Sequence, residues 1–177
     1  LRMNYNLKDK KIMVTGASGG IGKAICKKFI EENNILIFTS SNNDKLNDLK
    51  KEFGSDHFYY ELDLTDQVTI SEKVKKISND HKDIHTLINN AGITNDNLLL
   101  RMKESDWQEV INVNLNSNYY IIKEIIPQMI KNRNGNIIGI SSVIAFTGNP
   151  GQSNYSATKS GMISMYKSLA LEVAARN

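Results

Sequence analysis

The sequence contains little cysteine and little proline. Its 177 residues include one cysteine, Cys26, and two prolines. A single cysteine excludes an intrachain disulfide and a cluster of thiolate metal ligands, and it fits a reducing, cytoplasmic setting. Histidine is also scarce. The three histidines lack the spacing of metal ligands, so we predict no metal site.

An excess of one charge and a long apolar run are missing as well. The 22 Lys and Arg residues exceed the 19 Asp and Glu residues by only three, and no dense basic stripe occurs, so a nucleic-acid partner is not predicted. The most apolar run, Tyr119–Ile130, contains Lys123, Glu124 and Pro127, which argues against a membrane span. The N-terminal residues lack the basic and apolar segments of a secretory signal.

Short apolar runs alternate with segments of helical periodicity along the whole chain. The length predicts one domain, residues 1–177. Alternating strands and helices predict an α/β fold, a doubly wound parallel sheet covered on both faces. In such sheets, ligands bind in the loops that follow the strands. The predicted strands are Lys11–Thr15, Ile35–Thr39, Phe58–Leu62, Ile84–Asn89 and Asn136–Ser141, and the predicted helices are Ile21–Glu32, Lys45–Phe53, Val68–Ser78, Asp106–Arg133 (with a kink at Pro127) and Tyr155–Arg176.

A glycine-rich loop follows the first predicted strand and opens the first predicted helix. Gly16 permits a tight turn, Gly20 lets the backbone approach a pyrophosphate, and Gly22 lets the helix pack close to the strand. The helix N-terminus offers free N–H groups and a positive dipole. The spacing is G-x-x-x-G-x-G, and the alternative is a glycine-rich turn without a ligand. We predict a dinucleotide site that includes Gly16, Ala17, Ser18, Gly19, Gly20, Ile21 and Gly22.

The end of the second predicted strand bears on the choice of nucleotide. An enzyme that prefers NAD usually places a carboxylate there, against the ribose 2′-hydroxyl. Here the strand ends in Thr39, Ser40, Ser41 and Asn42, without a carboxylate, which favours NADP. No Lys or Arg in residues 39–43 pairs with a 2′-phosphate, and Ser41 is the predicted contact. The alternative is that these residues only form and cap a turn.

The last predicted strand and helix carry the residues for a reaction. Ser142 follows the strand, and Tyr155 stands four residues before Lys159, a spacing that puts both side chains on one helix face. A phenol in water has a pKa of about 10 and is a poor acid at neutral pH, but a nearby ammonium favours the phenolate. Tyr155 can then pass a proton to a carbonyl oxygen that the Ser142 hydroxyl orients. Alone, a Tyr-x-x-x-Lys pair is more often a surface helix pair.

Together these motifs resemble the short-chain dehydrogenase/reductase family over residues 8–177. The resemblance implies a Rossmann fold in which Asp63 contacts the adenine and Leu64 lines its pocket. It also implies that Asn114 anchors a water that relays protons through Lys159, which holds the nicotinamide ribose. Asn90, with Ala91 and Gly92, would stabilise the central strand and touch the cofactor ribose. The matching motifs are Thr15-Gly16-x-x-x-Gly20-Ile21-Gly22, Asp63-Leu64, Asn89-Asn90-Ala91-Gly92, Asn114, Ser142 and Tyr155-x-x-x-Lys159.

A narrower resemblance is to bacterial 3-oxoacyl-(acyl-carrier-protein) reductases, in residues 89–103, 148–155 and 167–174. It implies NADPH-dependent reduction of 3-oxoacyl-(acyl-carrier-protein) in fatty acid biosynthesis, by a homotetramer. Arg133 and Arg176 match positions that dock the acidic carrier protein, although each is equally well read as a solvated helix-end residue. Gly19 departs from the subfamily, which often has a basic residue there for the 2′-phosphate.

Two other functions stay open. A reductase of acetoacetyl-CoA or of a small ketone would share every catalytic residue. A catalytically silent dinucleotide-binding protein is the third possibility, and the intact set of Ser142, Tyr155 and Lys159 argues against it. Family members continue past the last helix with further strands and a loop over the substrate. We therefore expect the domain 1–177 to be incomplete at its C-terminus.

Overall fold

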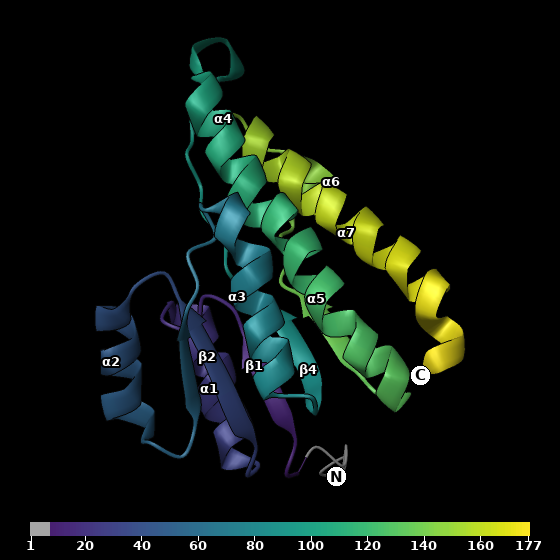
Figure 1. The fold of residues 1–177 in the computed structure, drawn as a ribbon. Coiled ribbons are helices and arrows are strands. Elements are labelled where there is room, and N and C mark those ends of the chain that lie inside the picture. The colour runs from purple at the N-terminus through teal and green to yellow at the C-terminus, as the bar shows by residue number, and fades with distance from the viewer. Residues whose placement is uncertain (1–7) are drawn as a thin grey trace, which may run out of the picture.

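The computed structural model describes residues 8–177, so residues 1–7 of the predicted domain lie outside the described part of the chain. One sheet of five parallel strands runs through the molecule in the order β3-β2-β1-β4-β5 (Figure 1). The order reverses between β1 and β4, which makes the carboxyl ends of these two strands the switch point where doubly wound sheets bind ligands. The strands are β1 (Lys11–Val14), β2 (Ile35–Ser40), β3 (Phe58–Glu61), β4 (Ile84–Asn89) and β5 (Asn136–Gly139).

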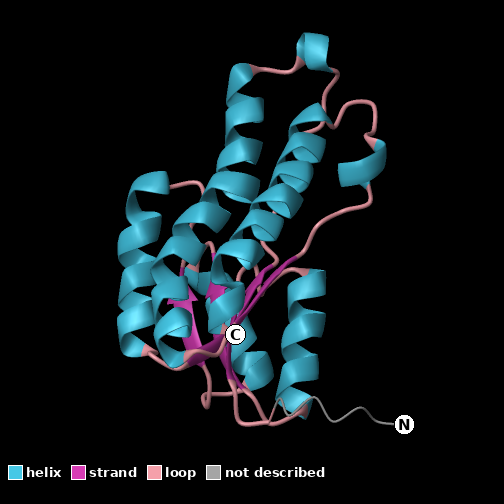
Figure 2. Ribbon diagram, turned by 90° about the vertical axis from the view of Figure 1, so that its right-hand side faces the viewer, coloured by secondary structure: helices cyan, strands magenta, loops and turns pink. Residues whose placement is uncertain are grey.

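Helices connect the strands and cover both faces of the sheet (Figure 2). Among residues 8–177, no helix is long and apolar enough to cross a membrane. The helices are α1 (Gly20–Glu31), α2 (Asn43–Phe53), α3 (Gln67–Asp80), η1 (Leu99–Arg101), α4 (Glu104–Ile111), η2 (Asn112–Asn116), α5 (Ser117–Asn132), α6 (Ile144–Thr147), α7 (Ser153–Val173) and η3 (Ala174–Arg176).

The apolar core on one face of the sheet lies under α1 and α2. Phe38 of β2 is fully buried there and stacks on Phe53 of α2 and on Tyr59 of β3, with ring centroids 5.4 and 4.9 Å apart. Cys26 of α1 belongs to the same core, and burial raises the pKa of its thiol to about 12. A thiol in this setting stays protonated at neutral pH and packs as a small apolar residue.

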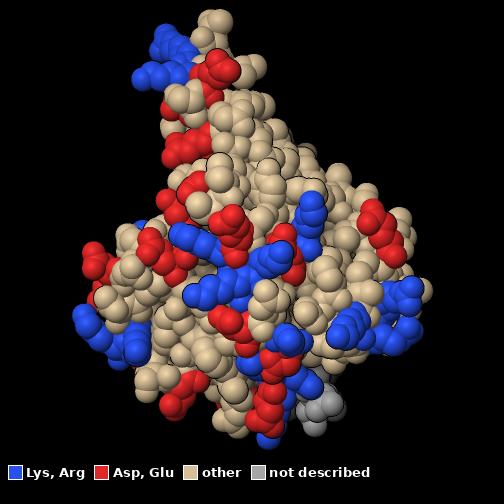
Figure 3. All heavy atoms as spheres, in the orientation of Figure 1, with Lys and Arg blue, Asp and Glu red and all other residues tan. Residues whose placement is uncertain are grey.

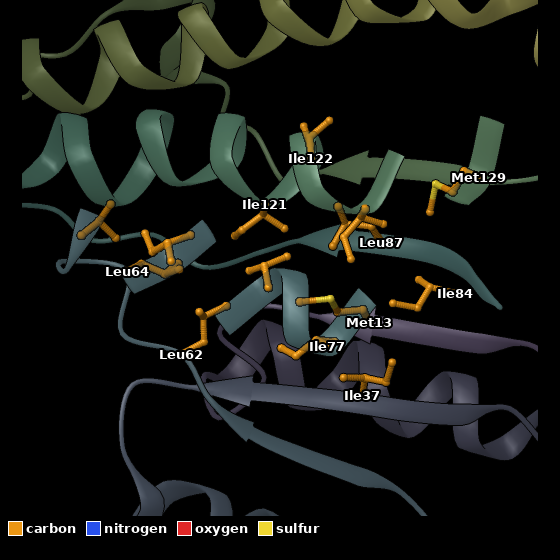
Figure 4. Close-up of a cluster of buried hydrophobic side chains, with 14 residues drawn as sticks. Met13, Ile37, Leu62, Leu64, Ile77, Ile84, Leu87, Ile121, Ile122 and Met129 are labelled. Carbon is orange, nitrogen blue, oxygen red and sulfur yellow. The ribbon is translucent and has the colours of Figure 1, made fainter. Parts of the chain in front are cut away.

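The core on the other face lies between the sheet and the helices α3 and α5. Figure 4 shows Ile121 of α5 beside Leu87 and Met13 of the sheet. Ile70 of α3 is fully buried in the same cluster, whereas Val68 on the same helix is 85% exposed. Burial of this face fixes where α3 and α5 lie, and with them the loops at the carboxyl edge of the sheet.

The predicted fold class is confirmed, because all four strand pairs are parallel and the strand order is that of a doubly wound sheet. The long helix predicted over Asp106–Arg133 is present as an unbroken helical run from Glu104 to Asn132. Its middle is the π-helical segment η2, in which the Ser117 amide donates to the Asn112 carbonyl five residues earlier. Pro127, where a kink was expected, lies inside α5.

We expect Ile70→Ala to destabilise the protein by about 2–5 kcal/mol, because it leaves a cavity in the core between α3 and the sheet. Val68→Ala removes an apolar side chain from the same helix, and it should change the free energy of unfolding by less than about 0.5 kcal/mol because Val68 is exposed. Urea unfolding followed by circular dichroism measures both values. Equal values for the two variants would contradict the placement of α3.

Candidate active site

The glycine-rich loop takes the conformation that its sequence predicts. Gly16 has φ +61°, and a Cβ built there would lie 2.8 Å from the Ala91 Cα, so only glycine fits. A Cβ on Gly22 would collide with the Gly16 carbonyl oxygen and would lie 2.9 Å from the Ala17 Cα. A Cβ on Gly20 would meet no described atom within 4 Å, so this side of the loop is open. The N-cap of α1 is Gly19, which has no side chain to satisfy the first N–H groups of the helix.

Hydrogen bonds join this loop to the loop that follows β4. The Asn90 side-chain amide donates to the carbonyl oxygens of Thr15 and Gly16, at 3.0 and 3.1 Å. In return, the Thr15 hydroxyl accepts from the main-chain N–H groups of Asn90 and Ala91, both at 3.1 Å. The two loops at the switch point of the sheet therefore have a fixed relative position.

A cavity of about 470 Å³ opens between these loops and the ends of β2 and β3. Its volume lies in the range of small-molecule and cofactor sites. Of the predicted cofactor residues, the structure places Gly16, Ser18, Gly19, Gly20, Ile21, Gly22, Ser41, Asp63, Leu64, Asn90, Ala91 and Gly92 on its wall. Ala17, Tyr155 and Lys159, also predicted to bind the cofactor, do not line the cavity. Ala17 is fully buried in the core under α1 and α2.

Residues after β2 and β3 form the wall away from the reaction centre. The Ser18 and Ser40 hydroxyls lie 2.9 Å apart and join the glycine loop to the end of β2. Asp63 accepts two hydrogen bonds from Thr65 through one carboxylate oxygen, from its main-chain N–H at 2.9 Å and from its hydroxyl at 2.8 Å. These bonds fix the turn after β3.

Lys45 also lines the cavity, and the sequence analysis missed it. The sequence predicts the start of the second helix at Lys45, and a cation for the 2′-phosphate was expected only within residues 39–43. In the structure, α2 begins two residues earlier, and the Asn42 side chain caps it by accepting from the Lys45 main-chain N–H at 3.0 Å. Lys45 stands in the first turn of the predicted helix as well, and its position just after the second strand was the signal that could have identified it.

Tyr155 and Lys159 lie near each other on the first turns of α7, as their spacing predicts. The Lys159 Nζ is 5.6 Å from the centroid of the Tyr155 ring and donates to the Ile140 carbonyl oxygen at 2.8 Å. Lys159 is only 4% exposed, and burial lowers the pKa of its ammonium from the ordinary value. A Cβ built on Gly92 would lie 3.5 Å from this Nζ, which puts Lys159 beside the cavity wall.

Ser142 lies two residues before the short helix α6, which periodicity could not reveal because it has only four residues. The Ser142 hydroxyl oxygen accepts from the Ile144 N–H at 3.3 Å, which leaves its proton available for a substrate oxygen. Two hydroxyls of α7, on Ser156 and Ser160, donate to carbonyl oxygens of α6 at 3.0 and 2.7 Å. α6 is thereby attached to the helix face that carries the tyrosine and the lysine.

Asn114 lies in the π-helical segment η2 and is fully buried. Its side chain binds the main chain of Ile93 at both ends, accepting from the N–H at 2.8 Å and donating to the carbonyl at 2.9 Å. The main-chain carbonyl of Asn114 accepts a hydrogen bond from the Asn118 side-chain amide at 2.9 Å. A Cβ on Gly92 would lie 3.3 Å from the Asn114 Oδ1, so Asn114 fixes the loop beside Lys159.

Arg133 and Arg176, the predicted docking residues, lie apart from the cavity at the far end of α7. The Arg133 guanidinium donates to the Ala175 carbonyl at 3.1 Å, so it lies against the turn that carries Arg176. Both arginines are exposed, and Figure 3 shows Lys and Arg atoms gathered where α5 and α7 end. The described residues hold no group of three or more His, Cys, Asp or Glu side chains that could bind a metal.

Comparison with known proteins gives consistent matches. The family model described as short chain dehydrogenase matches residues 10–177. A 3-oxoacyl-(acyl-carrier-protein) reductase of Buchnera aphidicola subsp. Acyrthosiphon pisum is 46% identical over 171 residues, which cover 97% of this chain and 70% of the relative. The corresponding reductase of Thermotoga maritima is 44% identical over 174 residues, covering 97% of this chain and 71% of the relative.

A relative with a different name is nodulation protein G of Rhizobium sp. (strain N33). It is 40% identical over 173 residues, which cover 98% of this chain and 71% of the relative. These matches confirm the resemblance predicted from the motifs. Because the family model covers nearly the whole chain, the protein belongs to the short-chain dehydrogenase family.

Proposed function

We propose that the protein reduces a 3-oxoacyl thioester on acyl carrier protein to the 3-hydroxyacyl thioester, with NADPH, in fatty acid biosynthesis. The observation that supports this most is the buried Lys159, which lies near the Tyr155 ring and beside Gly92 on the wall of a cavity bounded by an open glycine loop. The relatives named as 3-oxoacyl-(acyl-carrier-protein) reductases, at 44–46% identity, support the substrate.

The cavity fits a dinucleotide. The uncapped N-terminus of α1 and the open side of Gly20 suit a pyrophosphate, which needs N–H donors and a backbone without side chains. We propose that the loop 16–22 holds the pyrophosphate, and that Asp63 and Leu64 hold the adenine. Ser41 would hold the 2′-phosphate. Asn90, Ala91, Gly92, Tyr155 and Lys159 would hold the nicotinamide half.

When bound, the dinucleotide supplies a hydride to the carbonyl carbon of the substrate. The protein's part is to bind and protonate the carbonyl oxygen. Ser142, whose hydroxyl proton is available, orients that oxygen, and Tyr155 donates a proton to it as a general acid. The Lys159 ammonium, near the tyrosine ring, stabilises the phenolate that remains. Asn114 fixes the loop beside Lys159, where the proposed relay water would bind.

The proposed partner is acyl carrier protein, with Arg133 and Arg176 as its docking residues. Their exposed guanidinium groups offer positive charge to an acidic partner. We further propose a homotetramer in the cytoplasm, formed by the domain 1–177 as part of the enzyme. Exposed apolar side chains near and on α7 support association, since Phe146 is 77% and Leu171 83% exposed.

The activity is tested by following NADPH oxidation with a 3-oxoacyl-(acyl-carrier-protein), with acetoacetyl-CoA and with a small ketone. We expect the highest kcat/KM with the carrier-protein thioester. A higher value with either other substrate would favour the alternative reductases. Nucleotide binding without turnover of any substrate would favour the silent dinucleotide-binding protein.

Tyr155→Phe should lower kcat by about 10²–10⁴-fold, because the proton donor is lost while the ring stays in place. Binding of NADPH should change little, and stopped-flow or steady-state absorbance at 340 nm measures the rate. Tyr59→Phe is the matched control, since it removes a hydroxyl bonded to the Gly54 carbonyl on the opposite side of the sheet. A Tyr155→Phe protein with normal kcat would disprove the proposed acid.

Lys159→Met should abolish turnover but raise the free energy of unfolding at pH 7. The folded protein holds the Lys159 proton less tightly than the unfolded chain, because burial lowers its pKa. The charged ammonium therefore reduces stability at pH values below the lowered pKa. That cost disappears as the pH rises towards about 10.4, the value of a lysine in water.

Urea unfolding of both proteins between pH 7 and pH 10 measures this difference. We expect the stability gain of Lys159→Met to be largest at pH 7 and to shrink with rising pH. Lys50→Met, at an exposed position of α2, serves as the control for a charge removed in water. A Lys159→Met protein less stable than the wild type at pH 7 would contradict the assignment of an unfavourably buried cation.

The double variant Arg133→Glu/Arg176→Glu should raise KM for a 3-oxoacyl-(acyl-carrier-protein) by about tenfold or more, since it puts like charges against an acidic partner. KM for acetoacetyl-CoA should stay the same, because both arginines lie away from the cavity. The matched control is Lys75→Glu/Lys76→Glu, the same charge change on exposed residues of α3. Equal effects of the two double variants would exclude a specific docking site.

A further inference from the structure

The cavity wall at the end of β2 carries a cation, Lys45. Ser40, Ser41 and Lys45 form the wall at the end of β2, the strand whose carboxyl end receives the ribose 2′ position in dinucleotide folds. We propose that Lys45 holds the 2′-phosphate of NADPH, together with the serines of this wall, and thereby sets the preference for NADPH over NADH. This inference rests on the proposed function, in that the cavity takes a dinucleotide.

The start of α2 directs Lys45 towards the cavity. Figure 1 shows α2 following β2, with its N-terminus at the carboxyl edge of the sheet. Lys45 is the third residue after the Asn42 cap, in the first helical turn. The Cα–Cβ bonds of a helix tilt towards its N-terminus, so the side chain of a first-turn residue extends towards the preceding strand end. That strand end carries Ser40, whose hydroxyl meets that of Ser18.

The Lys45 ammonium is available for a ligand. It makes no ion pair or hydrogen bond with any residue that the structure describes. In contrast, two other lysines of this half are paired, Lys23 with Glu52 at 2.8 Å and Lys51 with Asp48 at 3.1 Å. An exposed lysine without a partner can turn to a phosphate without first breaking another interaction.

Two carboxylates near this wall, those of Glu61 and Asp63, have partners of their own. Glu61, at the end of β3, accepts from the Asn43 side chain at 2.8 Å. Asp63 accepts two hydrogen bonds from Thr65 and belongs to the turn after β3. The end of β2 carries no carboxylate to bind a free 2′-hydroxyl or to repel a 2′-phosphate. Asp63 on the cavity wall and Asp44 in the first turn of α2 are negatively charged, so the positive charge at this wall comes from Lys45 and from the positive end of α2.

The glycine loop forms the opposite wall of the same cavity, and Gly19 supplies no cation there. A single cation on the β2 side is enough to pair with a 2′-phosphate. The preference for NADPH can thus come from a lysine that lies 26 residues further along the chain.

The test is a binding titration of the protein with NADPH and NADH, followed by the fluorescence of the nicotinamide. Adenosine 2′,5′-bisphosphate and AMP are titrated by calorimetry, because they differ only in the 2′-phosphate. The wild type should bind the 2′-phosphorylated member of each pair more tightly. Lys45→Ala should weaken the binding of NADPH and of adenosine 2′,5′-bisphosphate by about tenfold, the size expected for losing one charged hydrogen bond. The dissociation constants of NADH and AMP should stay unchanged.

Three further variants sharpen the test. Lys45→Arg should keep the preference for the 2′-phosphate, and Lys45→Glu should reverse it. Lys50→Ala removes a charge from the same helix away from the cavity and should change none of the four dissociation constants. Raising the salt concentration should reduce the preference of the wild type but have little effect on Lys45→Ala.

Two results would overturn the inference while leaving dinucleotide binding intact. One is a Lys45→Ala protein with unchanged constants, and the other is an equal loss of affinity for NADPH and NADH. A wild type that binds neither dinucleotide would overturn the proposed function and this inference together. Discrimination by Lys45 in a protein without reductase activity would instead support the inference and reject the proposed reaction.

Discussion

The relative position of two loops, one after β1 and one after β4, determines the rest of this site. Thr15 and Asn90 exchange hydrogen bonds across the switch point of the sheet. β1 belongs to the half of the sheet that carries the proposed nucleotide wall, and β4 to the half that carries α7. Without this connection, the glycine loop and the loop before Ile93 could shift independently. Because Asn114 fixes Ile93 in turn, the connection extends to the surroundings of Lys159.

Periodicity in the sequence predicted the strands and helices well where the contacts of a residue lie within its own layer of the fold. The five strands were predicted to within two residues at each end, since buried apolar runs between helices have few alternatives. The π-helical turn η2 inside the long helix was not predicted. Asn114 in this turn binds Ile93, a residue 21 positions earlier in the chain, and local periodicity contains no information on such a contact.

The candidate active site shows the same contrast between features that local spacing predicts and features that depend on distant contacts. The glycine loop and the pair of Tyr155 and Lys159 follow from local spacing, and the structure places them as predicted. The position of Ser142 relative to α7 depends on α6, and α6 is too short to be detected from sequence periodicity. Lys45 was missed because a cation was expected only within residues 39–43, and the start of α2 was predicted two residues too late. Helix ends depend on capping residues, which give a weaker signal in the sequence than the apolar face of a helix does.

Because Cys26 is buried, the reactivity of its thiol reports on the opening of the core under α1 and α2. The thiol is fully buried under the nucleotide wall, and its raised pKa keeps it unreactive as long as α1 stays packed on the sheet. It is also the only thiol in the sequence. A thiol reagent can therefore label the chain only after this half of the sheet has opened. Under conditions where labelling is faster than reclosing, the labelling rate equals the rate of that opening, and a ligand bound at the glycine loop would slow it.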